Sequence, residues 1–318
     1  MEPFTKAEFE ASLKLRKVLE IPKELKRRQV VIFHCIIDAV FLDQWDVASI
    51  LYDHPASRPS TFMFDHIVKY MDPLKAALLR HDREAVLVML KNLYEKFDLV
   101  LTNSKFQQGN LKKYFDIKAH VVYPPVNLDM FHVSNPPPAS RTFFLSAQRV
   151  HWQKRIETQI AAFKGINAKL KIVGGEIEGV PDKCLTQLAR GCSNIEILGR
   201  VSDERLVSLF QSAKAIIQTG WFEDFGLVPV EAMACGTPVI CVDEGGFKET
   251  VHSPELGMRI QRPYIENLRN AVHGFDSKRY DSMLLREEAE KYGLHRFNEE
   301  MKNYIQLAIE KHREKHVV

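Results

Sequence analysis

The sequence has few cysteines and no long apolar run. Its 318 residues include five cysteines, and Cys35, Cys235 and Cys241 lie in apolar segments without the spacing of metal ligands. We therefore expect reduced thiols and no metal site. The longest apolar stretch, residues 30–42, contains a histidine and an aspartate and is shorter than the roughly 18 residues of a membrane-spanning helix. Because residues 1–17 also lack the apolar core of a signal peptide, we expect a cytoplasmic protein.

Neither sign of charge dominates the composition. The chain has 44 Lys and Arg against 41 Asp and Glu, a net charge of +3, so composition indicates no nucleic-acid partner. A P-loop is also lacking, because Gly174-Gly175-Glu176 does not lead into Lys-Ser/Thr, and no G-x-G-x-x-G follows a predicted strand. ATPase and dinucleotide-binding functions therefore lose support.

One stretch is locally basic. Residues 1–28 are expected to be helical, and basic residues between Lys14 and Arg28 outnumber Glu20 and Glu24 around several leucines. A basic amphipathic face can lie on an anionic membrane surface, but a solvated helix face explains the same pattern. Peripheral membrane contact is therefore one of two open interpretations.

Apolar runs alternate with helical stretches along the chain, which favours an α/β fold. Runs typical of buried parallel strands begin near residues 30, 47, 99 and 120, the alternation restarts near 141, and residues 282–315 look helical again. Between the two halves, residues 134–140 (SNPPPAS) contain three consecutive prolines, which neither a helix nor a central strand accommodates. We predict two Rossmann-like domains facing across a cleft, residues 1–135 and 136–318. Ligands are expected beyond the carboxyl ends of the strands.

The most specific motif is EDFGLVPVE, residues 223–231. A strand predicted to end at Thr219 leads into a loop with Gly226, and a helix is predicted to start near Val228 or Pro229. The N–H groups and dipole of that helix start suit a diphosphate, and Gly226 allows a close approach. Glu231, inside the helix, can accept a hydrogen bond from a sugar hydroxyl, and Glu223 lies on the loop before it.

This motif, with the AMACGTPVI that follows it, resembles the E-x7-E motif of the family 4 glycosyltransferases, the large group 1 family with the GT-B fold. The resemblance covers about residues 30–290. It implies that Glu223 contacts the transferred sugar and that Glu231 holds the ribose of the nucleotide. The residues between them that are expected to border the donor are Phe225, Gly226 and Leu227.

Two cations follow the first strand of the second half. In FLSAQRVHWQKRIETQIAAF a strand is predicted to end near Ala147, which leaves Arg149 and Lys154 in the loop before the next helix. Fixed cations at this place can stabilise the charge that develops on a departing diphosphate without a metal ion. Arg149 and Lys154 match the basic pair that does this in the same family.

Weaker signals border the same predicted pocket. By resemblance, Val201 and Asp203 would meet the nucleobase, although Asp203 can instead cap the helix that it begins. Residues 243–247 (DEGGF) resemble a glycine-rich loop that shapes the pocket, and Gly174-Gly175 resembles a loop common in the family or is only a turn.

In the first half, His54 follows a strand and resembles the family's histidine that faces the sugar from the acceptor domain, although a histidine at a strand end is also often structural. Arg58 is close enough in sequence to meet an acceptor phosphate. Ser104 is expected to cap the helix after it and to approach the cleft. His54 comes earlier than in the family pattern, so we expect a reduced N-terminal, acceptor-side domain.

These features predict a retaining, metal-independent transfer of a hexose to a glycan or lipid-linked acceptor, without a cofactor. The donor is expected to be GDP-mannose or a UDP-hexose, and the segments NSKFQQGNLKKYF and VVYPPVN resemble mannosyltransferases, which favours mannose. The alternative is a subunit that binds the nucleotide sugar and either needs a partner for activity or has no activity. An epimerase or phosphorylase fits the context of Arg149 and Lys154 less well.

Overall fold

The computed structural model describes residues 30–33, 48–53, 87–88, 91–135, 140–178 and 182–316. The chain forms two compact units. Unit 1 comprises residues 1–102, 108–121 and 300–318, and unit 2 comprises residues 103–107 and 122–299. The division into domains after residue 135 stays a prediction, since packing into compact units is a different criterion from a linker in the sequence.

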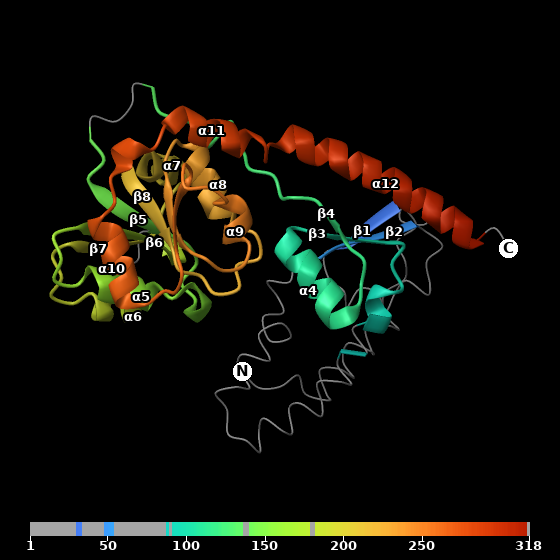
Figure 1. The fold of residues 1–318 in the computed structure, drawn as a ribbon, viewed down its shortest axis with the longest axis horizontal. Coiled ribbons are helices and arrows are strands. Elements are labelled where there is room, and N and C mark those ends of the chain that lie inside the picture. Colours follow the sequence, from blue (N-terminus) through green and yellow to red (C-terminus); the bar gives the residue numbers. More distant parts are fainter. Residues whose placement is uncertain are drawn as a thin grey trace, which may run out of the picture. The chain divides into compact units, whose positions relative to one another are not determined.

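Unit 1 contains a four-stranded parallel sheet in the order β1-β2-β3-β4 (Figure 1). The strands are Val30–Phe33, Ala48–Asp53, Leu99–Thr102 and His120–Val121. β2 and β3 are buried along their whole length, as expected for near-continuous apolar strands of a parallel sheet. Helix α4, Lys105–Phe115, connects β3 to β4, and its Gln107 N donates to Ser104 Oγ at 3.1 Å. Ser104 therefore caps α4, as predicted.

A buried carboxylate joins the end of the chain to this sheet within unit 1. Asp98 accepts hydrogen bonds from Lys315 Nζ at 2.8 Å and from Ser49 N at 2.9 Å, and His312 Nδ1 lies 3.1 Å away. Burial by itself raises the pKa of Asp98, but the hydrogen bonds from Lys315 and Ser49 outweigh burial and lower it overall. This compensation lets helix α12, Leu294–His316, end against the sheet with a charged group buried.

Unit 2 contains a six-stranded parallel sheet in the order β10-β9-β8-β5-β6-β7. Its strands are β5 Phe143–Ala147, β6 Lys169–Glu178, β7 Ile195–Arg200, β8 Ala213–Gln218, β9 Val239–Val242 and β10 Gly257–Ile260. Its α-helices are α5 Ile156–Phe163, α6 Lys183–Leu188, α7 Asp203–Ser212, α8 Leu227–Ala234, α9 Phe247–Thr250, α10 Ile265–His273 and α11 Ser282–Glu290. Two 3-10 helices are η4 Trp152–Lys154 and η5 Ser277–Arg279.

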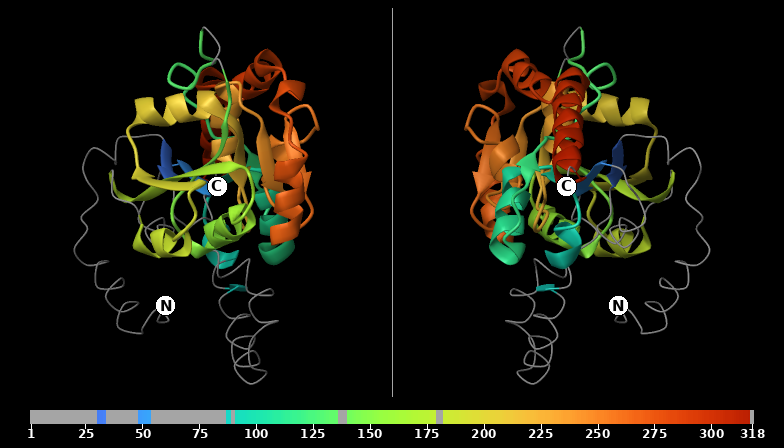
Figure 2. Two further views of the ribbon diagram at one scale, coloured as in Figure 1. Left: turned by 90° about the vertical axis from the view of Figure 1, so that its left-hand side faces the viewer. Right: turned by 90° about the vertical axis from the view of Figure 1, so that its right-hand side faces the viewer.

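Helices cover both faces of this sheet (Figures 1 and 2). α10 packs on α5 and α5 on α6, whereas α8 packs on α11 and α9. From β5 the chain runs outward through β6 to β7, then returns to β8 and continues in the opposite direction through β9 to β10. Because right-handed crossovers in opposite directions place their helices on opposite faces, the loops after β5 and β8 diverge between these two central strands. Such a switch point is where open α/β sheets bind their ligands.

The predicted class, α/β with parallel sheets in both halves, is confirmed. Two boundaries were predicted slightly late: β8 ends at Gln218, one residue before the predicted end, and α8 begins at Leu227, one or two residues before the predicted start. The sequence interpretation did not include α6, α9, β10 and α10. α9 and β10 have four residues each, which is too short for a periodic pattern to be recognised.

Several predictions on the first half concern residues outside the described ones. These are the basic helix of residues 1–28, the thiol of Cys35, and the roles of His54 and Arg58. The four described cysteines, Cys184, Cys192, Cys235 and Cys241, are free thiols. No helix in the described part of the chain has the length and apolar character needed to cross a membrane.

Candidate functional site

The two loops at the switch point bring Lys154 and Glu223 together. Lys154 ends η4 after β5, and Glu223 lies on the loop between β8 and α8. Lys154 Nζ lies 2.5 Å from Glu223 Oε2, and the two side chains are only 20% and 21% exposed. This pair joins two residues 69 positions apart, and it places a cation and a carboxylate at the carboxyl ends of the two central strands.

Hydrogen bonds lock these two loops to each other. Trp221 N donates to Gln153 O at 2.7 Å, and Thr219 Oγ1 donates to Lys154 O at 2.8 Å. The fully buried Gln159 on α5 donates to Thr219 Oγ1 at 2.7 Å. The position of Lys154 relative to Glu223 therefore follows from the backbone and not only from the ion pair.

Arg155 is a site-forming residue that the motif search missed. Its φ of 52° is in the left-handed region, which costs energy for a residue with a side chain. Its guanidinium lies 4.9 Å from the centre of the Trp221 ring, and Nη1 lies 3.5 Å from Glu244 Oε2. Arg155 thus connects the loops after β5 and β8 to the glycine-rich loop after β9, a relation between distant segments that spacing does not reveal.

The glycine-rich loop supports the backbone of Glu223. Gly246 N donates to Glu223 O at 2.7 Å. At Gly245, whose φ is 56°, a Cβ would lie 2.4 Å from Glu223 O, and at Gly246 it would lie 2.4 Å from Asp224 O. Both positions require glycine because the two loops touch backbone to backbone, and the expectation that residues 243–247 shape the site agrees with this contact.

The start of α8 is built as predicted around a glycine. Gly226 has a φ of 93° and precedes the first helical residue, and a Cβ there would lie 3.0 Å from the ring of Phe247. Leu227 is 39% exposed, whereas Phe225 is buried and its ring lies 5.4 Å from those of Tyr123 and Tyr292. The side chain of Phe225 therefore packs in the core, and only its backbone remains for the predicted donor contact.

Glu231 lies in a different environment from Glu223. Burial, with a smaller contribution from the carboxylate of Asp203, raises the pKa of Glu231 to about 7. Within the described part of the chain no hydrogen bond or ion pair reaches this carboxylate. Glu231 lies in the second turn of α8 and Asp203 is the first residue of α7. The effect of Asp203 on the pKa of Glu231 shows that the structure brings these two predicted donor residues near each other.

The alternative role of Asp203 as a helix cap is wrong. Ser202 precedes the first helical residue of α7, and its Oγ accepts from Arg205 N at 3.3 Å. Asp203 is the first residue of the helix and is exposed, while Val201 packs partly buried against the core. Ser and Asp both make good caps, and adjacent candidates cannot be ranked from sequence because the backbone dihedrals decide which one lies outside the helix.

Arg149 stands apart from the Lys154–Glu223 pair. It is exposed, and none of the described carboxylates forms an ion pair with it. The backbone before it is fixed, since a Cβ at Gly174 would lie 2.0 Å from Gln148 O and Gln148 N donates to Val173 O at 3.1 Å. Of the four residues predicted to converge, the structure joins Lys154 to Glu223 and does not join Arg149 or Glu231 to them.

Two further acidic residues in unit 2 hold the segment that starts α4. Glu249 accepts from Lys105 N at 2.9 Å, from Phe106 N at 2.7 Å and from the Tyr123 hydroxyl at 2.9 Å. Asp224, next to Glu223, accepts from Gln107. These partners are more than 100 residues apart in sequence, which is why no local pattern marks them.

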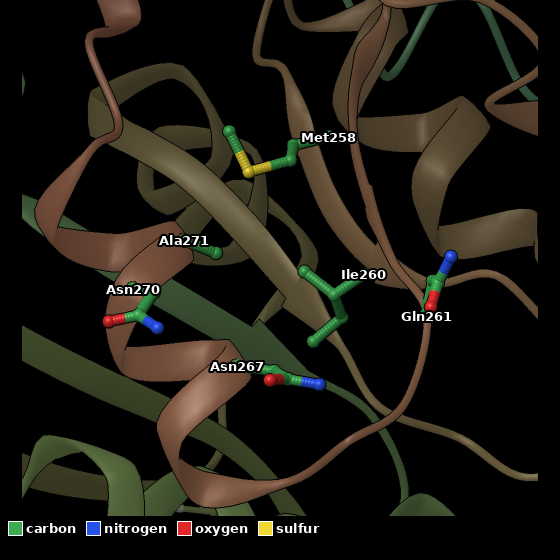
Figure 3. A pocket seen from close by; sticks show the side chains of 6 residues that line it. All are labelled: Met258, Ile260, Gln261, Asn267, Asn270 and Ala271. Carbon is green, nitrogen blue, oxygen red and sulfur yellow. The ribbon is translucent and has the colours of Figure 1, made fainter.

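A hollow of about 440 Å³ lies at another place in unit 2 (Figure 3). It is open and lies between β10 and α10, lined by Met258, Ile260, Gln261, Asn267, Asn270 and Ala271. None of the predicted site residues lines it. The described residues also contain no group of three histidine, cysteine or acidic side chains that could hold a metal ion.

A model of the family described as "Glycosyl transferases group 1" matches residues 129–293, just over half of the chain. The chain belongs to this family. The matched segment of this group 1 glycosyl transferase contains Lys154, Glu223 and Glu231 and most of unit 2.

Curated relatives are similar over part of their length. A glycosyltransferase of Methanocaldococcus jannaschii is 26% identical over 55% of this chain and 48% of the relative. Alpha-1,3/1,6-mannosyltransferase ALG2 of Rhizomucor pusillus is 27% identical over 51% of this chain and 46% of the relative. The chain thus spans about half the length of these curated relatives.

Solved structures share the fold over nearly the whole chain. The match to sucrose-phosphate synthase from Thermosynechococcus elongatus spans 95% of this chain and 77% of the synthase chain, with a TM-score of 0.72 and 22% identity. The match to HepE from Anabaena, in complex with UDP and glucose, spans 96% of this chain and 84% of the HepE chain, with a TM-score of 0.69 and 16% identity. These likenesses confirm the predicted GT-B fold class of this group 1 glycosyl transferase.

Proposed function

We propose that this group 1 glycosyl transferase moves a hexose from a nucleotide diphosphate sugar to an acceptor hydroxyl. The observation that carries the proposal is the Lys154–Glu223 pair at the switch point of unit 2. A departing nucleoside diphosphate gains negative charge on its β-phosphate, and the Lys154 ammonium, held by the backbone of its loop, stabilises that charge. Because the diphosphate competes with Glu223 for Lys154, its arrival frees Glu223 to accept from the hydroxyls of the transferred sugar.

The start of α8 supports the same placement of the diphosphate. The first N–H groups of an α-helix have no partner inside the helix, and the helix dipole favours an anion there. Gly226 brings this backbone to the end of the loop that carries Glu223. We assign the exposed Arg149 as the second cation, which reaches the phosphates from the loop after β5.

Glu231 and Asp203 are suited to the nucleoside part of the donor. A partly buried carboxylate with a pKa of about 7 and no hydrogen bond from a described residue gains a partner when ribose hydroxyls donate to it. Binding of ribose therefore lowers the pKa of Glu231. We assign the base to the backbone near Val201 and to Asp203.

Mannose from GDP-mannose is our first choice of donor sugar, with UDP-hexoses as the second. The name of the Rhizomucor relative, a mannosyltransferase, supports the first, and the UDP and glucose bound to the Anabaena protein support the second. We further propose a family 4 enzyme that retains the anomeric configuration, needs neither metal nor cofactor, and uses a glycan or lipid-linked acceptor. His54 and Arg58 are the proposed acceptor-side residues. We place the protein in the cytoplasm. Liposome flotation of the full chain and of a variant without residues 1–28 tests membrane contact.

Nucleotide release tests this function directly. The full chain is mixed with GDP-mannose, UDP-glucose or UDP-galactose in EDTA, with and without glycan acceptors, and released GDP or UDP is measured. Release in EDTA that is lost in Glu223→Gln supports the proposal, whereas strict dependence on a divalent metal rejects the metal-independent mechanism. Calorimetric nucleotide binding without turnover on any acceptor indicates the binding-subunit alternative instead.

A further inference from the structure

Five aromatic rings form a continuous row beside the Lys154–Glu223 pair. The ring centres of His151 and Trp152 lie 5.6 Å apart, those of Trp152 and Trp221 6.1 Å, and those of Trp221 and Phe222 5.6 Å. Phe106 continues the row at 6.3 Å from Phe222. We call these residues the aromatic row, and all five belong to unit 2.

Four of the five rings come from the same two loops as the proposed catalytic pair, and Phe106 comes from α4. Trp152 is two residues before Lys154 in η4, and Phe222 directly precedes Glu223. The hydrogen bond from Trp221 N to Gln153 O fixes the halves of the row to each other. The chain has three tryptophans in all, so two of the three stand within two residues of the pair.

Two members of the row stand out. Trp152 is 52% exposed, so its ring offers a large apolar surface to solvent next to Lys154. Phe222 has a φ of 50°, in the left-handed region that residues with bulky side chains avoid. Strained residues of this kind persist where a site requires a particular side-chain direction.

The chemistry of the row fits a sugar ring better than an aliphatic chain. One face of a pyranose consists of C–H bonds that stack on an aromatic ring, while its hydroxyls need polar partners. The row supplies both, because ionic side chains accompany it: Lys154 and Glu223 come from the same two loops, and the Arg155 guanidinium lies 4.9 Å over the Trp221 ring. With Trp221 occupied by Arg155, Trp152 is the ring that offers its surface.

We infer that the aromatic row is a subsite for a hexose ring of a glycan acceptor, with Trp152 as its stacking residue. The inference rests on the proposed function, which assigns the donor sugar to Glu223 and Lys154 and thereby leaves the neighbouring row for the acceptor. Trp152 lies in the same 3-10 helix as Lys154, two residues away, and an acceptor ring stacked on it is therefore close to the donor sugar that the proposed function assigns to Lys154 and Glu223.

Ligand-detected saturation-transfer NMR on the full chain tests the subsite without knowledge of the natural acceptor. The probes are mannobiose, maltose and cellobiose, and GDP and UDP are measured separately. We expect saturation of ring C–H protons in at least one disaccharide, a dissociation constant raised at least about fivefold by Trp152→Ala, and near-normal binding in Trp152→Phe, which keeps a ring. Tyr264→Ala is the matched control, since Tyr264 is 58% exposed and lies outside the row.

The outcomes separate this inference from the proposed function. Nucleotide binding unchanged in Trp152→Ala, together with weakened disaccharide binding, supports the subsite. Disaccharide binding that is the same in wild type, Trp152→Ala and Tyr264→Ala overturns it, as does a chain that binds nucleotide but none of the disaccharides. Tryptophan fluorescence that is protected from a soluble quencher by phosphatidylcholine vesicles, and not by sugars, also overturns the inference and favours a lipid surface. If the wild-type chain binds neither GDP nor UDP, the proposed function itself is rejected.

Discussion

The two glutamates of the E-x7-E motif occupy opposite electrostatic environments. Glu223 lies on a loop, 2.5 Å from the Lys154 ammonium, with its backbone braced by Gly245 and Gly246. Glu231, eight positions later in α8, is partly buried with no cation partner among the described residues, and its pKa is raised to about 7. One motif thus carries a carboxylate paired with a cation and a carboxylate whose pKa is raised to about 7. Tertiary neighbours, not the residue type, set this difference.

The largest effect is expected from removing the partner of Glu223. We predict that Lys154→Ala lowers nucleotide release about 100- to 1000-fold, because the charge on the departing phosphate loses its fixed cation. Single-turnover release of GDP or UDP measures the effect. Lys183→Ala, an exposed lysine on α6, is the control and should leave the rate unchanged. Equal rates in both variants would remove Lys154 from the chemistry.

The second prediction concerns the pH dependence that Glu231 gives to stability. Between its usual pKa of 4.5 and the folded value of about 7, the folded state holds a proton that the unfolded state releases. The free energy of unfolding should therefore fall by up to about 3 kcal/mol from pH 4.5 to pH 7.5 through this group.

Glu231→Gln keeps the shape and removes the titration. We expect a flatter pH profile of the free energy of unfolding, higher stability than wild type at pH 8 and weaker nucleotide binding, measured by urea unfolding and calorimetry without and with nucleotide. Identical pH slopes in the two proteins would show that Glu231 is already ionised at neutral pH.

The third prediction separates two effects of Gly245: the strain of its own backbone and its contact with the backbone of Glu223. Gly245 and Gly191 both have positive φ, but only at Gly245 does a Cβ meet another backbone, that of Glu223. Alanine at either place costs about 1–2 kcal/mol of strain, and at Gly245 the clash adds about 1–3 kcal/mol. In thermal unfolding, Gly245→Ala should have a lower melting temperature than Gly191→Ala. Only Gly245→Ala should also slow nucleotide release. An equal loss of stability would show that the glycine-rich loop can move away from Glu223.

The smallest effect tests the helix start next to Glu231. Ser202→Ala should destabilise the protein by about 1 kcal/mol, because it removes the cap of α7. Asp203→Ala should cost less, because it removes only a charge at the helix start and also relieves the effect of Asp203 on Glu231. Urea unfolding of the two variants at pH 8 gives the order. A larger loss for Asp203→Ala would restore Asp203 as the capping residue.

Local patterns were sufficient for most elements of unit 2. The end of the strand before EDFGLVPVE and the start of the helix within it were predicted to within two residues, because an apolar strand, a glycine and a proline in the first helical turn are all local signals. The four-residue α9 and β10 were missed, since so few residues show no period. Ser202 was missed as a cap because Asp203 competes with it on equal terms.

The candidate site was predicted in its residues but not in its connections. Spacing and resemblance selected Lys154, Glu223 and Glu231, yet the contact between Lys154 and Glu223 crosses 69 positions. The roles of Arg155, Asp224, Glu249 and the aromatic row depend on segments that are adjacent only after folding. The rarity of tryptophan beside Lys154 and Glu223 is the signal that could have pointed to the row.

Sequence alone determined the α/β class, the family and the candidate residues proposed to bind a nucleotide sugar, because apolar period, helix-start chemistry and motif spacing are local features of the chain. The tertiary structure alone decided which of those residues meet and that Glu223 is paired, whereas Glu231 is partly buried with no cation among the described residues as its partner. It also decided that five rings from two loops and α4 form one row. The physical reason is that charge state and contact depend on burial and on long-range partners. Those are set by the order of the strands and not by any local segment.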